Sequence, residues 1–376
     1  MEADDPERIA SGKHYNFIVD GPAKLLMSVP ALLGYVPLES LVVIGLKPAV
    51  ESGRPEIDLI AHLDLTVIRG THSTEVASTV AVQMQHSGVR TAVVVIVGGS
   101  GSRDRLPYEA EREDMSRALL DHGIETVDSL WAQAITVGAQ WCSYEDDAIH
   151  GLLADWQNQP LSLHTAVLGD GVRSSREAFG DELRPIDRGN CERRSRKLAA
   201  ADPIVTSKQI VKAVHRILDA VHDAESDRLP VTDEDFINLA LALNCRQARD
   251  VALLLCLGTR QRTASRRLWR HLIRGLLKPD AAPAAAVLAL AHCLDFNTNA
   301  AYAAVKHAQA GKPKSLLVGI LKKTLDNPAA LKVIGKVLRE RADEVLKSAY
   351  CTPDYGLEVK LEHTPDGDLE LRRHPI

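Results

Sequence analysis

The sequence is poor in aromatic residues, which make up 4% of its 376 residues, so Ala, Leu and Val must fill most of the core. It contains no run of about 18 consecutive apolar residues, the length that a membrane-spanning helix needs. Its first residues, Met1–Glu7, are acidic and lack the apolar stretch of a secretory signal peptide. We therefore expect a soluble, cytoplasmic protein with no membrane contact.

Paired cysteines and an excess of positive charge are missing too. None of the six cysteines has a partner at Cys-x-x-Cys spacing, which predicts reduced thiols and no zinc or redox motif. A net charge of −5 excludes a chain whose whole surface binds nucleic acid. His62 and Asp64 are two positions apart on an expected strand, so their side chains share one face, and His72 follows. No further ligand for a metal ion is evident. We predict neither a metal ion nor a cofactor.

The N-terminal half alternates between helical and strand-like segments. A helix begins at Gly21–Pro22 and ends at Gly34, because Pro suits a first helical turn and Gly suits a C-cap. Apolar or alternating runs then predict strands at Leu41–Ile44, Ile57–Leu65, Thr91–Val97 and Ile124–Leu130, with Ile135–Trp141 pairing with the last, and helices at 74–87 and 109–122. The pattern predicts a three-layer α/β sandwich with a mostly parallel or mixed sheet over residues 1–195.

The rest of the chain has a different sequence pattern, first helical and then that of a hairpin. From residue 196 to 348 helical periodicity continues without a strand-like run, starting at a capping box in Thr206–Gln209, so we expect an all-α domain. Residues 349–376 hold two alternating segments around Pro365–Asp368, which predicts a β-hairpin tail. This hairpin either joins the N-terminal sheet or stands as an appendage.

One segment carries a family resemblance. Its residues form the pattern Val-Pro-x-Leu-Leu-Gly-aromatic-x-Pro followed by Ser-Leu-Val, namely Val29, Pro30, Leu32, Leu33, Gly34, Tyr35, Pro37, Ser40, Leu41 and Val42. This pattern resembles the opening of the bacterial family called domain of unknown function 4192. Residues 174–177 and 248–250 are similar to its Ser-Arg-Glu and Val-Arg-Asp segments. The resemblance implies a fold shared over most of residues 20–325 and brings no activity with it.

Two turns next to strands hold the candidate ligand-binding residues. Glu39 and Ser40 enter the first strand, where Ser40 is either a nucleophile that needs a nearby base or a hydroxyl that bonds the turn backbone. The segment Gly98–Arg105 follows the strongest strand, and Gly99, Ser100 and Arg103 either cradle a phosphate or form a flexible loop. Neither segment matches a nucleophile elbow or a phosphate-binding loop motif.

A third candidate is the most basic stretch of the chain, at residues 260–278. Arg262, Arg266, Arg270 and Arg274 recur every four residues and therefore line one helix face. Such a face binds nucleic acid or an acidic partner, or it is a solvated face paired with Asp and Glu. With a net charge of −5, the sequence favours the solvated face.

Three functional hypotheses follow, and the sequence leaves open whether the protein is an enzyme. The first is a non-catalytic binding or protein-interaction module, because no motif satisfies the geometry of a known catalytic group. The second is an enzyme that acts on a small phosphorylated or nucleotide ligand at the turn of Glu39 and Ser40 and the loop Gly98–Arg105. The third is a nucleic-acid-associated protein that uses the helix at 260–278. The partner expected is accordingly another protein or a small anionic ligand.

Overall fold

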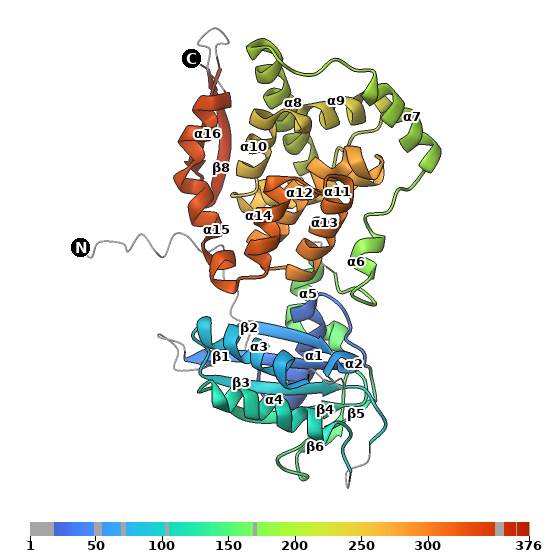
Figure 1. Ribbon diagram of the computed structural model, residues 1–376, viewed down its shortest axis with the longest axis vertical. Helices are drawn as coiled ribbons and strands as arrows, with labels where there is room; N and C mark the ends of the chain where they lie inside the picture. Colours follow the sequence, from blue (N-terminus) through green and yellow to red (C-terminus); the bar gives the residue numbers. More distant parts are fainter. Residues whose placement is uncertain are drawn as a thin grey trace, which may run out of the picture. The chain divides into compact units, whose positions relative to one another are not determined.

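The computed structural model describes residues 19–48, 55–68, 73–101, 105–167, 171–349, 357–365 and 367–375 (Figure 1). The chain divides into two compact units, an α/β unit within Asn16–Arg176 and a helical unit within Glu177–Ile376. The N-terminal mixed sheet, the helical region and the C-terminal two-stranded sheet are the architecture that the sequence predicts.

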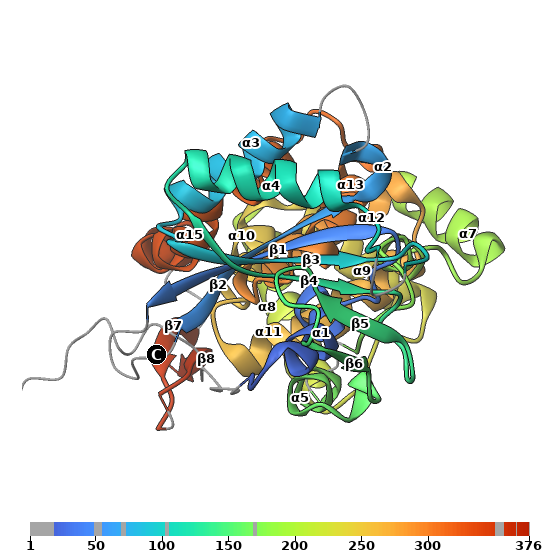
Figure 2. The ribbon, with the colours of Figure 1, turned by 90° about the horizontal axis from the view of Figure 1, so that it is seen from below.

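The α/β unit is built around a six-stranded sheet of order β2-β1-β3-β4-β5-β6. Only β3 and β4 are parallel, so the sheet is mixed. Its elements are α1 (Pro22–Leu33), β1 (Ser40–Pro48), β2 (Pro55–Asp64), α2 (Leu65–Ile68), α3 (Ser73–His86), β3 (Thr91–Val97), α4 (Glu109–Asp121), β4 (Glu125–Ala132), β5 (Gln140–Ser143), β6 (His150–Leu152) and α5 (Pro160–Val167). Figure 2 shows α3 and α4 on one face of the sheet and α1 and α5 on the other, which makes three layers.

The segment that carries the family resemblance has the structure its sequence predicts. Helix α1 has Pro22 in its first turn and ends at Gly34, whose φ of 78° lies in the left-handed region that favours glycine. Strand β1 follows, and its residues Leu41–Ile44 are completely buried. It lies between β2 and β3, antiparallel to both. Helices cover both faces of this central strand, which explains its continuous apolar run.

The sequence interpretation is wrong at residues 135–141. A strand was expected there, but β5 begins only at Gln140, and residues 133–139 form a loop. Gly138 has a φ of 77°, and Val137 leaves 69% of its surface exposed. The apolar residues Ile135 and Ala139 point into the protein while the loop turns, which imitates the alternation of a strand.

The helical unit packs its helices around one large apolar core. They are α6 (Ala178–Asp181), α7 (Arg188–Ala199), α8 (Ser207–Glu225), α9 (Asp233–Asn244), α10 (Arg246–Leu254), α11 (Thr259–Arg274), α12 (Lys278–Leu294), α13 (Thr298–Gly311), α14 (Leu316–Leu325), α15 (Pro328–Glu340) and α16 (Ala342–Ala349). The capping box at Thr206 and Gln209 begins α8 as predicted, and a second one at Thr232 and Asp235 begins α9.

The helical unit begins at Glu177, upstream of the domain boundary between residues 195 and 196 that the sequence predicts. That position falls within α7, a polar helix whose N-terminus is capped by Asp187, since its Oδ1 accepts a hydrogen bond of 3.0 Å from the Asn190 amide. Helix α7 packs on α9 and buries Cys191, Arg194 and Leu198. In the sequence, its polar and basic residues resemble a linker. In the structure, one face of the helix packs on α9.

The predicted hairpin consists of β7 (Leu357–His363) and β8 (Leu369–Pro375) and lies on the helical unit. The Gln261 side chain pairs with the backbone of Leu371 as a neighbouring strand would, giving and accepting hydrogen bonds of 3.1 and 2.9 Å. Asp368 accepts hydrogen bonds from the Thr259 amide at 3.0 and 2.9 Å, so it caps α11, which has no side-chain cap of its own. The hairpin therefore belongs to the helical unit.

Candidate functional site

An open cleft of about 700 Å³ lies in the α/β unit where β3 and β4 end and β1 begins. Three segments far apart in the sequence meet there because Ser40 in β1 pairs with Val97 in β3, and β4 lies beside β3. The residues that line the cleft are Glu39, Gly99, Ser100, Gln133, Ala134, Thr136, Val137, Gly138 and Ala139. In α/β sheets, the carboxyl ends of strands are where ligands commonly bind.

The Glu39 carboxylate is held by two donors from the segment after β3. Its Oε1 accepts a hydrogen bond of 2.9 Å from the Gly99 amide, and its Oε2 accepts one of 2.5 Å from the Tyr108 hydroxyl. These bonds join residues that are 60 and 69 positions apart in the sequence. They fix the carboxylate at the wall of the cleft.

Glu39 and Tyr108 both have strained backbones. Their φ angles are 42° and 62°, in the left-handed region that side chains other than Gly rarely adopt. Such a conformation costs of order 1–3 kcal/mol and persists only where its surroundings enforce it. These two strained residues lie beside the cleft and are hydrogen-bonded to each other.

Neighbouring aromatic side chains hold the Gly98–Gly99 turn in place by hydrogen bonding and close packing. The Trp131 indole donates a hydrogen bond of 2.8 Å to the Gly98 carbonyl, and Trp131 is itself buried. Gly99 has a φ of +71°, and a Cβ there would lie 2.7 Å from Cε2 of Tyr108. The Tyr144 hydroxyl donates to the Pro107 carbonyl, and burial raises the pKa of Tyr144 well above its usual value near 10, which keeps this donor protonated.

Ser40, which follows the cleft residue Glu39, is 1% exposed and does not line the cleft. Its Oγ donates a hydrogen bond of 2.7 Å to the Leu38 carbonyl and lies 2.8 Å from Nε2 of His62. A hydroxyl has one proton, so while Ser40 donates to Leu38, His62 must be the donor to Ser40. In this arrangement His62 does not withdraw the serine proton, and the pair holds the entrance to β1.

The structure thus brings together Glu39, Gly99 and Ser100 and places Ser40 behind them. Arg103, the fifth candidate, lies outside the described residues, as does His72. Sequence reasoning missed Tyr108 and the loop at 133–139. A tyrosine after a Gly-rich loop carries no motif, and the loop resembled a strand; only the Gly138 in it signalled a turn.

Arg262 and Arg266 of α11 face the protein, so they are paired with a carboxylate, as the favoured interpretation expected, but they are not solvated. The Asp295 carboxylate binds both of them, at 2.7 Å from Nε of Arg262 and 3.2 Å from Nη1 of Arg266. Their side chains are 12% and 7% exposed. The apolar residues of α11 wrap far enough around the helix to draw this face inward.

The other two arginines of the stripe are half-buried. Nε of Arg270 lies 3.8 Å from Oε2 of Glu182, and Arg274 lies at the end of the same face. Trp269, which precedes Arg270 in the sequence, is 0% exposed and packs in the core. Three of the four arginines on this face therefore lie within 3.8 Å of a carboxylate, Asp295 or Glu182.

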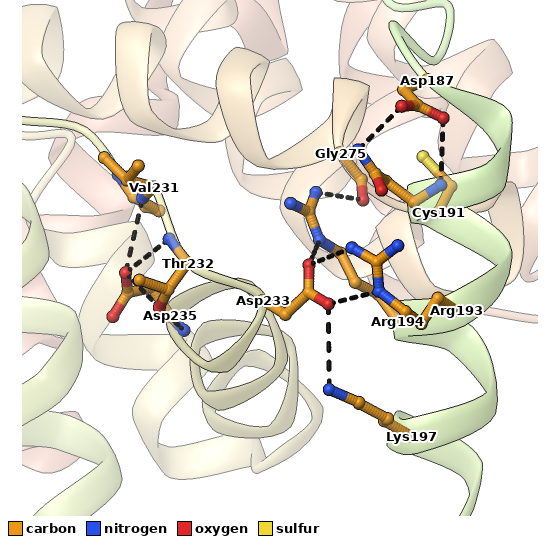
Figure 3. Close-up of polar contacts among 12 residues, drawn as sticks. Asp187, Cys191, Arg193, Arg194, Lys197, Val231, Thr232, Asp233, Asp235 and Gly275 are labelled. Carbon is orange, nitrogen blue, oxygen red and sulfur yellow. Dashed lines mark hydrogen bonds and ion pairs between the residues drawn. The ribbon is translucent and has the colours of Figure 1, made fainter.

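A second carboxylate gathers three basic side chains of α7 (Figure 3). Asp233, the first residue of α9, lies 2.7 Å from Nε of Arg193, 2.7 Å from Nε of Arg194 and 3.8 Å from Nζ of Lys197. Arg194 also donates to the Gly275 carbonyl at 3.0 Å. Its Cζ stacks 3.8 Å from the ring centroid of Phe236. These contacts clamp α7 to the helical core.

The Asp233 clamp gives the stability of the protein a predictable pH dependence. Its hydrogen bonds to Arg193 and Arg194 lower the pKa of Asp233 well below the usual 3.8. The clamp therefore contributes its full stabilisation above pH 3.8, where the carboxyl is ionised in both the folded and the unfolded chain. The contribution declines as the pH falls below 3.8, because the unfolded chain then takes up the proton first. We expect Asp233→Asn to be less stable than wild type by the same amount at pH 7 and pH 5, and by a smaller amount at pH 3. Urea unfolding at the three pH values measures this.

The control for that series is Asp223→Asn, which breaks an exposed ion pair with Arg228. Exposed pairs contribute about 0–1 kcal/mol, so this variant should stay close to wild type. A deficit of Asp233→Asn that is unchanged between pH 7 and pH 3 would show that the ionised carboxylate is not what stabilises the clamp.

Among the residues that the structure describes, no helix is both long and apolar enough to cross a membrane. No group of three or more His, Cys, Asp and Glu side chains among them is arranged to hold a metal ion. The five described cysteines are buried, and burial raises the pKa of the Cys256 and Cys293 thiols to about 12.

The fold and the cleft define a protein of two units, in which a mixed α/β sandwich with a strained, ligand-sized cleft precedes a helical unit. The family model described as Domain of unknown function (DUF4192) matches residues 22–329, and the chain belongs to this family. The match includes the cleft and most of the helical unit but not the hairpin. No curated protein and no solved structure matches the chain.

Proposed function

We propose that this protein is a non-catalytic binding protein whose α/β unit holds a small ligand in the cleft. The observation that supports this most is the meeting of Glu39, the Gly99 turn and the loop 133–139 at the carboxyl ends of β3 and β4. The cleft volume of about 700 Å³ falls within the range of small-molecule sites. Two of the four described non-glycine residues with a positive φ, Glu39 and Tyr108, lie at the same place.

The geometry gives less support to an enzyme. The serine that the sequence offered as a nucleophile, Ser40, is buried, and its hydroxyl donates a hydrogen bond to a backbone carbonyl. A nucleophile must reach the substrate and be deprotonated by a neighbouring base. Binding without turnover asks only for the shape and the polar groups that line the cleft.

A nucleic-acid role has less support again. Three of the four arginines proposed for it are paired with Asp295 or Glu182, and their side chains are 7–24% exposed. Binding through phosphate contacts depends on cations that can release counterions at the surface. A cleft in the α/β unit therefore remains the better supported site.

Two glycine variants test the proposal, and the two glycines that they replace have nearly the same φ angle. Gly99 and Gly123 have φ angles of +71° and +72°, but a Cβ at Gly99 meets Tyr108 whereas a Cβ at Gly123 meets nothing within 4 Å. A metabolite panel is screened by thermal shift with wild type, Gly99→Ala and Gly123→Ala. A ligand at a hundred times its Kd stabilises by about 2.7 kcal/mol, which is a shift of several degrees in Tm.

We expect such a shift for wild type and Gly123→Ala and its loss in Gly99→Ala, with no chemical change of the ligand. Equal shifts in all three proteins would place the ligand elsewhere. Turnover of the bound compound would contradict the non-catalytic part of the proposal. The absence of any shift in wild type across the panel would contradict ligand binding itself.

A further inference from the structure

We infer that the outer faces of α14 and α15 bind the surface of an anionic lipid bilayer, with aliphatic side chains in its interface and lysines against its headgroups. The two helices follow one another in the chain, contact each other and both pack on α12 (Figure 1). The α14–α15 surface is defined by six exposed residues, Leu316, Ile320, Lys323, Val333, Lys336 and Val337. The inference concerns the helical unit and does not depend on the cleft.

The first reason is the exposure of aliphatic side chains on the two helices. Leu316 and Ile320 in α14 are 79% and 51% exposed. Val333 and Val337 in α15 are 49% and 48% exposed. Each pair is four residues apart and therefore lies on one face of its helix, while the opposite face packs in the apolar core. Apolar side chains that gather on a surface, rather than being scattered singly, mark an interaction site.

The second reason is an excess of positive charge at the same place. Residues 312–340 contain seven Lys and Arg but two Asp and Glu, in a chain whose net charge is −5. Lys323 follows Ile320 by three residues, and Lys336 follows Val333 by three, so each exposed lysine lies beside an aliphatic side chain. Within the described part of the chain, neither lysine forms an ion pair. Their charge is therefore available to an anion outside the chain.

The composition of this surface favours lipid over a protein or a nucleic acid. Protein interfaces are depleted of lysine, and their binding energy comes mainly from Trp, Tyr and Arg. Helices α14 and α15 contain no aromatic residue, which also removes the stacking that single-stranded nucleic acids use. The phosphates of a duplex would meet the lysines but not the aliphatic side chains. An anionic bilayer uses both, because aliphatic side chains enter its interface while lysines meet its headgroups.

This inference departs from the expectation of no membrane contact. That expectation rests on the lack of an apolar run long enough to span a bilayer. A helix that lies on the bilayer surface needs no such run, since only one of its faces leaves water. Two short amphipathic helices that are anchored in the helical core present such a face without crossing the membrane.

Vesicle flotation with the full chain tests the inference. The probes are unilamellar vesicles of phosphatidylcholine alone and of phosphatidylcholine mixed equally with phosphatidylglycerol. We expect wild type to float with the anionic vesicles and to bind the neutral ones much more weakly, because each Lys near an anionic surface contributes about 1 kcal/mol, or about fivefold in the binding constant. Binding should weaken as the ionic strength rises, since salt screens this attraction.

Two variants separate the contribution of charge from that of the aliphatic side chains. The double variant Lys323→Gln and Lys336→Gln should bind the anionic vesicles about 25-fold more weakly, from two losses of about fivefold each. Leu316→Gln should bind them about tenfold more weakly, since burying a leucine side chain is worth at least about 1.5 kcal/mol. All three positions are exposed, and circular dichroism verifies that the variants fold.

The matched controls carry the same kinds of substitution elsewhere on the helical unit. Lys208→Gln combined with Lys212→Gln removes two exposed lysines of α8. Val231→Gln replaces an aliphatic side chain that is 83% exposed. Both control proteins should float with the anionic vesicles as wild type does.

Several outcomes would overturn the inference, each in a different way. Wild type that binds neither kind of vesicle, or both equally, does not recognise an anionic bilayer. Site variants that float like wild type place the lipid on another surface. Duplex DNA that binds wild type and Leu316→Gln but not the lysine variant, without flotation, assigns the surface to nucleic acid. A dimer that Leu316→Gln converts to a monomer, again without flotation, assigns it to a second copy of this chain. The proposed function is tested separately by the Gly99→Ala and Gly123→Ala variants.

Discussion

Replacing Asp295 by alanine is expected to lower the free energy of unfolding by about 3–5 kcal/mol, the range found when one partner of a buried ion pair is removed. Asp295 is the carboxylate that Arg262 and Arg266 share, and both arginine side chains are almost fully withdrawn from solvent. Without it, two guanidinium groups of α11 stay in the protein without this counter-charge. Urea unfolding followed by circular dichroism measures the loss.

The matched control is Arg267→Ala on the same helix. Its ion pair with Asp227 is exposed, with side-chain exposures of 41% and 77%, so we expect a change of about 0–1 kcal/mol. A loss for Asp295→Ala no larger than that of the control would mean that the two arginines reach solvent. The stripe would then again be a candidate surface for nucleic acid or an acidic partner.

Replacing Gly258 by alanine is expected to release the C-terminal hairpin. Gly258 has an ordinary φ of −78°, so a side chain there causes no backbone strain. Its Cβ, however, would lie 1.8 Å from the Leu369 carbonyl oxygen, and one of the two backbones must move away. The Asp368 cap of α11 is then lost, together with the pairing between Gln261 and Leu371.

We expect Gly258→Ala to cost about 2–4 kcal/mol. A helix cap is worth about 1 kcal/mol, and the buried side chains of Val359 and Leu371 add about 1.5–3 kcal/mol each, part of which is offset by the entropy that the hairpin regains. Urea unfolding measures the total. Hydrogen exchange at the Leu371 amide, which is bonded to Gln261, should accelerate.

The control for this variant is Gly319→Ala in α14, where a Cβ meets nothing within 4 Å. Alanine favours a helix over glycine, so this change should stabilise the protein by up to about 1 kcal/mol. If Gly258→Ala is as harmless and Leu371 keeps its protection, the hairpin tolerates the added methyl group and does not depend on this close approach.

These two variants concern the same helix, α11, and together they define its role. Asp368 caps its start, Asp295 binds its arginines, and Trp269 and its apolar neighbours anchor it in the core. A helix tied down at its start, along its basic face and in the core is a structural element. That leaves the cleft of the α/β unit as the place where a ligand is expected.

Local signals in the sequence predicted most of the fold. The Pro22 and Gly34 limits of α1, the buried run of β1, and the capping boxes of α8 and α9 all depend on residues within a few positions of one another. The hairpin was visible for the same reason. The prediction failed at 135–141, where two inward-facing apolar residues in a loop gave the alternation of a strand.

The candidate site was predicted only in part. Glu39, Gly99 and Ser100 were chosen because they follow or precede strands, where turns bring polar groups to a sheet edge. Tyr108 and the loop 133–139 gave no local signal of a part in the site, because that part depends on which strands become neighbours. The inward direction of the α11 arginines was equally hidden, since a helix face lined with arginine has the same period whether it meets water or Asp295.

The sequence by itself determined the kinds of element in this protein, their order, its family and the turns at which a site could form. The tertiary structure alone decided that Glu39 meets Gly99 and Tyr108, that Ser40 is buried against His62, and that the hairpin caps α11. The physical reason is how far apart in the sequence the interacting residues lie. Burial patterns and caps act over a few residues, whereas these contacts join residues 22 to 109 positions apart, and only the packed sheet and helices bring them together.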